Sequence, residues 1–243
     1  MTLKNILSRI ESMSSASKNC KDCSAYSQSF FRNLGADSIH YLQSNKTQAE
    51  YKRGDTFSVE NEPADSVFCV MNGSAKVTLY QKSIVRLVAA GDMLGYRCIF
   101  SQQKFRATAS ALGPVVACKI SKESINHLIA KEPAFAGEML KRMGDEIAAS
   151  EHHHYSFCKK SVRERIAEAF CILVKKFGTE TPQGIRIDTH LTRVELANWI
   201  GAAKETVIRE LSDFKDEKLI SEVELHFYVT NYHSVKLLAG LTN

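Results

Sequence analysis

The sequence predicts an α+β protein in which a unit of short β-strands is followed by one long helix and then by a mainly helical unit. Three observations support this prediction. Turn signals separate short apolar runs over residues 47–120, residues 133–160 follow a helical period, and residues 161–243 contain further helical patterns broken by a glycine. A chain of 243 residues is long enough to build two hydrophobic cores.

The β unit is indicated by its turns, which follow one another at the short intervals typical of a barrel or roll. The clearest hairpin is expected between residues 66–70 and 75–79. Asn72-Gly73 lies between these two runs and tolerates the positive φ of a tight turn. The pattern therefore predicts that the two strands pair with each other.

Residues 133–160 are expected to form one long helix, because the segment has no internal proline and its apolar residues recur at helical spacing. The stripe consists of Leu140, Met143, Ile147 and Phe157, and Ser150 and His154 continue it. An isolated helix with an apolar stripe needs a partner, and a second copy of the same helix is the simplest one. The sequence thus predicts a homodimer. The alternative, that the helix packs on the β unit of its own chain, stays open.

The last third of the chain begins with an amphipathic helix over residues 161–177, which Gly178 ends. A short strand over 225–229 and a final helix over 234–241 are also expected. Together these segments predict four parts: an N-terminal segment, a β unit, a dimerisation helix and a mainly helical unit, over residues 1–30, 31–132, 133–160 and 161–243.

Bulk charge does not explain what the chain binds. The formal net charge is +5, but residues 159–243 contain 13 basic and 12 acidic residues, a net charge of only +1. The chain contains no run of about 18 apolar residues, which is the length needed to cross a membrane. Residues 1–5 also lack the apolar core of a signal peptide. A cytoplasmic protein without a membrane partner is therefore predicted.

Two adjacent helices are predicted on either side of Gly201. Thr192 and Glu195 form a capping-box pattern that starts the first helix, and Gly201 can take the left-handed conformation that ends it. Three residues later a second helix begins, with an inward face formed by Val207, Leu211 and Phe214. This is the geometry of a helix-turn-helix, which fits its second helix into the major groove of DNA.

The outward face of the second helix then carries side chains that can reach base edges. Arg209 can donate two hydrogen bonds to guanine, Glu205 can accept one from cytosine, and Ile208 can contact a thymine methyl group. The alternative is that Glu205 and Arg209 form an ordinary i, i+4 ion pair on a solvated helix. The predicted DNA-binding residues are Thr192, Arg193, Lys204, Glu205, Thr206, Ile208 and Arg209.

These features resemble the CRP/FNR family of bacterial transcription regulators over nearly the whole chain, most specifically over residues 191–209. The resemblance implies a cyclic-nucleotide-binding-like β-roll, a long dimerisation helix and a winged helix-turn-helix. It also implies a homodimer that binds double-stranded DNA at a palindromic site and recruits or blocks RNA polymerase. In that family the positions of Glu205 and Arg209 read the TGA core of each half-site. Lys204 and Ile208 depart from the family's usual residues, which leaves the outer bases open, and Ala203 replaces the usual helix cap.

The resemblance also locates an effector pocket, where cyclic-nucleotide binders of the family hold ribose and phosphate. The corresponding residues are Gly95, Tyr96, Arg97, Arg106 and Ala107. Tyr96 stands where those binders have a ribose-binding Glu, and Ala107 stands where they have a hydroxyl side chain. Losing both contacts disfavours cyclic AMP. Two alternatives remain. The arginines hold another small anionic effector, or they form ordinary ion pairs on the surface or in loops.

Seven cysteines, an odd number, indicate thiols or metal ligands rather than a disulfide framework. Cys20, Cys23 and Cys118 match three of the four iron–sulfur ligands of FNR-type oxygen sensors, but Ser29 occupies the position of the remaining one. Three hypotheses follow: a cluster with an atypical fourth ligand, a thiol–disulfide switch, or idle thiols. The missing thiolate favours the last two. The other cysteines assessed are predicted to be buried apolar residues, namely Cys69, Cys98 and Cys171.

The run His152-His153-His154 does not predict a metal site within one chain, because consecutive helical side chains point about 100° apart. A site formed across a dimer by His154 is an alternative. With no nucleophile–base set and no phosphate loop, an enzyme is not expected. The sequence predicts a DNA-binding transcription regulator, and the alternative function is a ligand-binding signalling module that acts through protein contacts.

Overall fold

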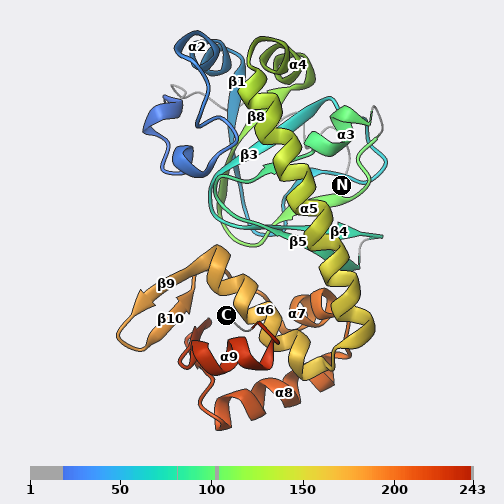
Figure 1. The fold of residues 1–243 in the computed structure, drawn as a ribbon, viewed down its shortest axis with the longest axis vertical. Helices are drawn as coiled ribbons and strands as arrows, with labels where there is room; N and C mark the ends of the chain where they lie inside the picture. Colours follow the sequence, from blue (N-terminus) through green and yellow to red (C-terminus); the bar gives the residue numbers. More distant parts are fainter. Residues whose placement is uncertain (1–18, 81, 102–103, 242–243) are drawn as a thin grey trace. The chain divides into compact units, whose positions relative to one another are not determined.

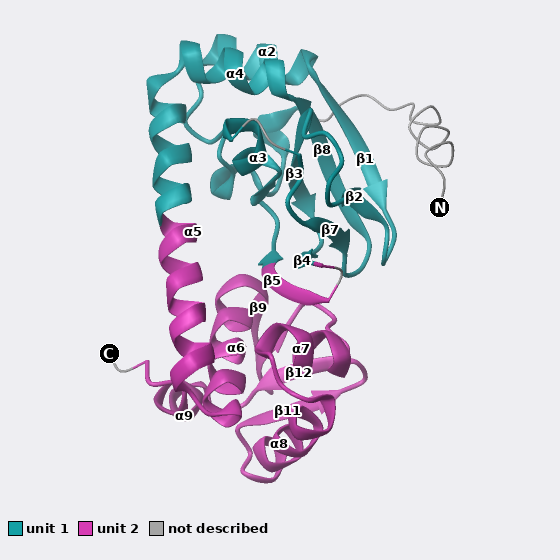
Figure 2. Ribbon diagram, turned by 90° about the vertical axis from the view of Figure 1, so that its right-hand side faces the viewer, with its two compact units in different colours: residues 1–79, 87–144 teal, residues 80–86, 145–243 magenta. Residues whose placement is uncertain are grey.

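The computed structural model describes residues 19–80, 82–101 and 104–241, so the amino-terminal residues 1–5, for which no signal peptide is expected, lie outside the described part. The chain divides into two compact units (Figure 2). Unit 1 comprises residues 1–79 and 87–144, and unit 2 comprises residues 80–86 and 145–243.

The strands between residues 46 and 121 form two four-stranded sheets (Figure 1), with strand orders β1-β8-β3-β6 and β2-β7-β4-β5. The predicted α+β class and the all-β segment are confirmed, although a short helix, α3 (Tyr96–Phe100), interrupts that segment. The strands are β1 (Lys46–Tyr51), β2 (Thr56–Ser58), β3 (Ser66–Asn72), β4 (Ala75–Leu79), β5 (Ser83–Val88), β6 (Met93–Leu94), β7 (Thr108–Ala111) and β8 (Val115–Ser121).

Strand β3 is buried on both of its faces. Successive side chains of a strand point to opposite sides, so Cys69 and Met71 join one apolar cluster while Phe68 and Val70 join another. Its neighbour β8 alternates in the same way, and it directs Cys118 into the cluster that holds Cys69. The alternation of these two central strands therefore brings thiols together in one core.

The predicted hairpin between residues 66–70 and 75–79 is wrong. Gly73 does have a positive φ of 89°, as the Asn-Gly pair predicts. However, β3 pairs with β6 and β8, whereas β4 pairs with β7, so the turn links two different sheets. The dipeptide determines only the local backbone. Pairing is decided by the burial of β3 on both faces, which no local pattern contains.

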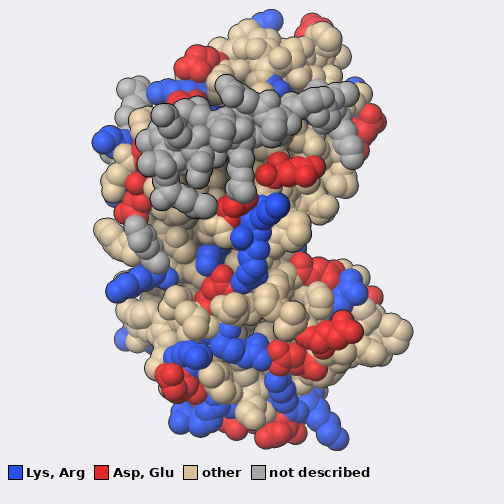
Figure 3. Space-filling model, turned by 180° about the vertical axis from the view of Figure 1, so that it is seen from behind, with Lys and Arg blue, Asp and Glu red and all other residues tan. Residues whose placement is uncertain are grey.

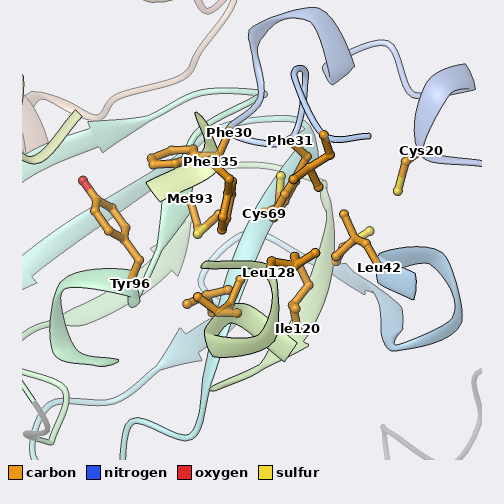
Figure 4. Close-up of a cluster of buried hydrophobic side chains, with 14 of the residues drawn as sticks. Cys20, Phe30, Phe31, Leu42, Cys69, Met93, Tyr96, Ile120, Leu128 and Phe135 are labelled. Atoms are coloured by element: carbon orange, nitrogen blue, oxygen red, sulfur yellow. The ribbon is translucent and has the colours of Figure 1, made fainter. Parts of the chain in front are cut away.

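Helices cover the cluster that contains Cys69. The short 3-10 helices η1 (Cys20–Asp22) and η2 (Tyr26–Gln28) precede α2 (Ala36–Ser44), and α4 (Lys122–Lys131) follows β8. Helices η1, α2 and α4 contribute buried side chains to the cluster, including Cys20, Leu42 and Leu128 (Figure 4), and Ile125 of α4 joins them. None of the four elements is predicted by the sequence patterns, because η1 and η2 span three residues each and α2 and α4 only nine and ten.

The long helix predicted over residues 133–160 is confirmed as α5 (Pro133–Lys159). Its first turns bury Phe135 and Met139 in the core of unit 1, so part of the helix packs on the β unit of its own chain. A different face leaves Leu140 and Ile147 exposed, at 69% and 57%. The face of α5 that packs on the β unit is thus not the face that is predicted to meet a second copy of the helix.

Unit 2 contains α6 (Val162–Phe177), whose N-terminus is closed by a capping box of Ser161 and Glu164. A four-stranded sheet with the order β11-β12-β10-β9 lies in the same unit. The predicted strand over 225–229 is β12, and the predicted final helix is α9. The remaining elements of unit 2 are β9 (Gly178–Thr181), β10 (Gly184–Ile187), α7 (Arg193–Ile200), α8 (Lys204–Asp216), β11 (Ile220–Val223), β12 (His226–Val229) and α9 (Tyr232–Leu238).

Candidate nucleic-acid interface and thiol site

Helices α7 and α8 have the geometry of the predicted helix-turn-helix. The Thr192 hydroxyl accepts a hydrogen bond from the backbone N–H of Glu195 at 3.1 Å, and the Glu195 carboxylate accepts one from the N–H of Thr192 at 2.8 Å. Gly201 ends α7 with φ 69° and ψ 49°. Helix α8 then begins without a side-chain cap, because Ala203 has no hydrogen-bonding group.

Apolar packing fixes which face of α8 points outward. Val207, Leu211 and Phe214 are buried, and the Phe214 ring stacks on Phe170 of α6 with centroids 6.3 Å apart. These residues recur at i, i+4 and i+7, so they anchor one side of the helix along its length. The opposite side is left to solvent.

Helix α8, which we call the recognition helix, exposes Lys204, Glu205 and Arg209. Ile208 is 44% exposed, while Thr206 is half-buried. Among the described residues, none forms a hydrogen bond or ion pair with the side chains of Lys204, Glu205 or Arg209. The i, i+4 pair that offers a purely structural explanation of Glu205 and Arg209 is therefore not formed.

Arg193 is held by its own protein. Its guanidinium donates to both carboxylate oxygens of Glu222, at 2.6 and 2.7 Å, and lies 4.7 Å from the centre of the Phe227 ring. Burial raises the pKa of Glu222, but hydrogen bonds from Arg193 and Lys215 outweigh it, and the net pKa lies below its usual value. Arg193 thus ties α7 to β11, and its DNA contact stays a prediction.

Strands β11 and β12 form a hairpin after the recognition helix. Glu224 in its turn has a positive φ of 51°, and the adjacent Leu225 is 69% exposed at the tip. The sequence predicted β12 but not β11, because Ile220–Val223 is too short and too polar to show a strand period. This hairpin is the wing that the resemblance implies.

The surface does not carry one dominant sign of charge. On the face shown in Figure 3, basic and acidic side chains are interspersed over the described residues. This agrees with the net charge of +1 over residues 159–243. The charge on this face therefore gives no reason to expect a uniform electrostatic attraction to phosphate.

The residues of the expected effector pocket differ in their exposure to solvent. Gly95 has φ 85° and caps α3, and the next residue, Tyr96, is 1% exposed in the core cluster, where its ring lies 5.2 Å from that of Phe30. Figure 4 shows Tyr96 and Cys20 at opposite ends of this cluster. Arg97 and Arg106 are exposed, and Ala107 is half-buried.

Four thiols line one cavity in unit 1. The sequence singled out Cys20, Cys23 and Cys118, and the structure adds Cys69, which stands directly opposite Cys118 on the paired strands β3 and β8. Spacing along the chain could not identify Cys69, because strand register brings it to the cavity. Cys69 and Cys171 are buried as predicted, whereas Cys98 is only partly buried. Cys118, which the sequence singled out as a possible cluster or redox residue, is buried as well.

A lysine and a serine complete the lining of this thiol cavity. The Lys46 ammonium donates a hydrogen bond to the Cys20 sulfur at 3.1 Å. Ser29 donates to the Tyr26 carbonyl at 2.8 Å and accepts from the Phe31 N–H at 3.2 Å, so its hydroxyl is used locally. Burial raises the pKa of the Cys118 thiol to about 11, against the lowering influence of Lys46, and burial also raises the pKa of Cys69.

Comparison with protein-family models finds two matched domains. Residues 48–132 match the cyclic nucleotide-binding domain, and residues 164–236 match the Crp-like helix-turn-helix domain. Together these matches cover the two parts of the chain whose geometry is described above. The chain belongs to the CRP/FNR family. It is a transcription regulator with a helix-turn-helix DNA-binding domain.

Relatives extend this similarity over the whole chain. Electron transport regulator A of Shewanella oneidensis is 24% identical over 245 residues, covering 99% of this chain and 98% of its own length. The fumarate and nitrate reduction regulatory protein of Salmonella typhi is 25% identical, with 98% and 97% covered. Among solved structures, FixK2 from Bradyrhizobium japonicum has a TM-score of 0.71 at 19% identity, covering 79% of this chain and 96% of its own.

The FNR-type members of the family raise the question of an iron–sulfur cluster, which the thiol cavity as arranged does not fit. Its free volume is about 30 Å³. This is room for roughly two water molecules, whereas a four-iron cluster has an eight-atom core. The described residues also contain no three His, Cys, Asp or Glu side chains placed to hold one metal ion. The thiol cavity as arranged therefore has neither the room nor the ligand set of a four-iron cluster. Separately, none of the described helices combines the length and apolarity that a bilayer-spanning segment needs.

Proposed function

We propose that the protein is a homodimeric, sequence-specific DNA-binding regulator that recognises a palindromic site with a TGA-type core in each half-site. The main support for this proposal is that Glu205 and Arg209 lie exposed, one helical turn apart, without a partner among the described residues. Arg209 reads a guanine through O6 and N7, and Glu205 accepts a hydrogen bond from a cytosine amino group. Lys204, Thr206 and Ile208 contact the flanking bases or backbone, and Thr192 and Arg193 contact the backbone.

The exposed apolar face of α5 supports the homodimer. Leu140 and Ile147 are separated by seven residues, the repeat of a two-stranded coiled coil, and both are more than half exposed. A second copy of the same helix offers an identical stripe, so the interface is self-complementary. Two recognition helices then read half-sites about 34–36 Å apart, one turn of DNA. Bound in the cytoplasm near a promoter, the dimer recruits or blocks RNA polymerase.

The β-roll of unit 1 supplies the control. The signal is a redox change at the thiol cavity or a small ligand, and cyclic AMP is disfavoured, because Tyr96 is buried where nucleotide binders of the family have a ribose-binding Glu. These signals are distinguished by measuring DNA affinity in three samples: the reduced protein, the protein after mild peroxide treatment, and the protein with added cyclic AMP. A response to cyclic AMP alone would contradict this assignment.

The test of DNA reading is a binding titration with a palindromic TGA-containing duplex and a scrambled duplex of equal length. We expect Arg209→Ala to lose about 1–3 kcal/mol on the palindrome and to leave the scrambled duplex unaffected. Lys218→Ala, which removes a basic residue just after the recognition helix, is the control and should preserve the preference. Equal binding of both duplexes, with weak salt dependence, would favour a signalling module that acts through protein contacts.

A further inference from the structure

Near the end of α5, a histidine and a cysteine lie one helical turn apart and touch. The Nε2 atom of His154 is 3.9 Å from the sulfur of Cys158, and both side chains are exposed. Two ligands of one tetrahedral zinc, at about 2.1 Å for nitrogen and 2.3 Å for sulfur, stand about 3.6 Å apart. The pair therefore needs a shift of only a few tenths of an ångström to chelate one ion.

The three consecutive histidines of α5 differ in their surroundings, and His154 is the one available for binding. His152 points to Glu168 of α6, with Nε2 2.5 Å from a carboxylate oxygen. His153 is half-buried, and burial lowers its pKa. Cys158 likewise differs from the thiols of the thiol cavity, which lie in unit 1, because it is exposed.

His154 also continues the exposed apolar stripe of α5. Leu140, Ile147 and His154 follow one another at intervals of seven residues, so they occupy one position of a heptad repeat. In the homodimer proposed above, equivalent positions of two parallel helices face each other across the symmetry axis. The two His154 side chains thus meet at the C-terminal end of the paired helices, each with its own Cys158 beside it.

We propose that His154 and Cys158, together with the partner subunit's His154 and the partner subunit's Cys158, form a four-ligand site for a zinc-like divalent cation. This inference rests on the proposed homodimer, because one chain supplies only half of the ligands. Two neutral imidazoles and two thiolates balance the charge of the cation, so binding releases the two thiol protons. The bound ion joins the two α5 helices four residues before α6 and the DNA-binding unit begin.

The experiment measures the dimer dissociation constant of the full chain by analytical ultracentrifugation, under reducing conditions, with EDTA or with zinc chloride. The complete site exists only in the dimer. Zinc at a free concentration 100 times the dissociation constant of the zinc site should therefore lower the dimer dissociation constant about 100-fold. We expect this zinc-dependent change to vanish in His154→Ala and in Cys158→Ser. Matched controls at a neighbouring histidine and at a cysteine of α3, His153→Gln and Cys98→Ser, should keep it.

A second measurement identifies the ligands. Cobalt added in place of zinc should give the visible bands of a tetrahedral ion and a thiolate charge-transfer band, saturating at one His154- and Cys158-dependent ion per dimer. If the protein dimerises in EDTA and zinc leaves the dimer unchanged, the metal site is wrong and the homodimer stands. If it remains monomeric with and without zinc, both are wrong. Zinc-dependent tightening that survives in His154→Ala would place the ion elsewhere.

Discussion

The recognition helix and the thiol cavity place their polar groups in opposite environments. On α8, Lys204, Glu205 and Arg209 extend into solvent over a tightly packed apolar face. In unit 1, Cys69 and Cys118 are enclosed among apolar side chains, and Lys46 is buried beside Cys20. The first region presents its chemistry at the surface, and the second keeps it inside the core.

This difference shows that the two regions impose different requirements on a partner. The recognition helix is already formed and exposes these polar side chains, so the contacts proposed for them do not require α8 to refold. The enclosed thiols react only where the surrounding core opens, because burial keeps them protonated and shielded from solvent. A reagent can therefore reach Cys69 and Cys118 only after the packing around β3 and β8 has loosened. The following experiments challenge this contrast.

The largest expected effect lies beneath the recognition helix. Phe214→Ala should destabilise unit 2 by about 3–5 kcal/mol, since the side chain is fully buried and stacked on Phe170. Chemical denaturation monitored by circular dichroism checks this value. Ile208→Ala, on the solvent side of the same helix, is the matched control and should change stability by less than about 0.5 kcal/mol. Similar losses in both variants would mean that the two faces are misassigned.

A buried carboxylate connects α5 to α6 within unit 2. Glu168 accepts hydrogen bonds from Ser156 at 2.7 Å and Lys160 at 3.0 Å. Because it is buried beside these partners, removing its charge in Glu168→Gln should cost about 3 kcal/mol. Lys160 would then be left without its anion, although it also donates to a backbone carbonyl, that of Ala239.

The pH dependence of this variant has a definite sign. Burial raises the pKa of Glu168, but the bonds from Ser156 and Lys160 outweigh it, so the folded pKa lies below the ordinary 4.5. A lowered pKa stabilises the fold fully above the unfolded value, and this contribution is lost as the pH falls through the folded pKa. Denaturation at a series of pH values should show the stability difference between wild type and Glu168→Gln narrowing as the pH falls below about 4. A constant gap down to strongly acidic pH would refute this assignment.

Thiol labelling tests whether the thiol cavity is closed to solvent. With a pKa of about 11, Cys118 carries little thiolate at pH 8. Its alkylation by iodoacetamide should therefore be more than 100-fold slower than that of a free thiol with a pKa of about 8.5. Mass spectrometry of peptides follows Cys118 and the exposed Cys158 in the same sample. If both cysteines react at similar rates, the thiol cavity is open in solution.

The smallest expected effect concerns the start of the recognition helix. Ala203 offers no side-chain acceptor to the first turn of α8, so Ala203→Ser should stabilise unit 2 by about 0.5–1 kcal/mol. The change lies outside the base-reading face, and the preference for the palindromic over the scrambled duplex should stay the same. Thermal unfolding and DNA titration of the same variant separate the two results. A lower melting temperature would indicate that the N-terminus of α8 is satisfied in another way.

Most of the DNA-binding unit was predictable, because its determinants are local. A capping box, a glycine with a positive φ and an i, i+4, i+7 apolar face each lie within a few residues, and the structure contains all three. Arg193 is the exception. Its contact with DNA stays a prediction, but its ion pair with Glu222 involves a residue 29 positions away, and no local pattern includes that partner.

The sequence by itself determined the order of the units, the long helix α5 and the outward position of Glu205 and Arg209, because backbone propensity and periodic burial act over short spans of chain. Tertiary structure alone decided that β3 does not pair with β4, that Cys69 faces Cys118 and that the described residues leave the face of α5 carrying Leu140 and Ile147 exposed. The physical reason is that strand pairing and burial depend on contacts between distant residues, whose free energies no short segment contains.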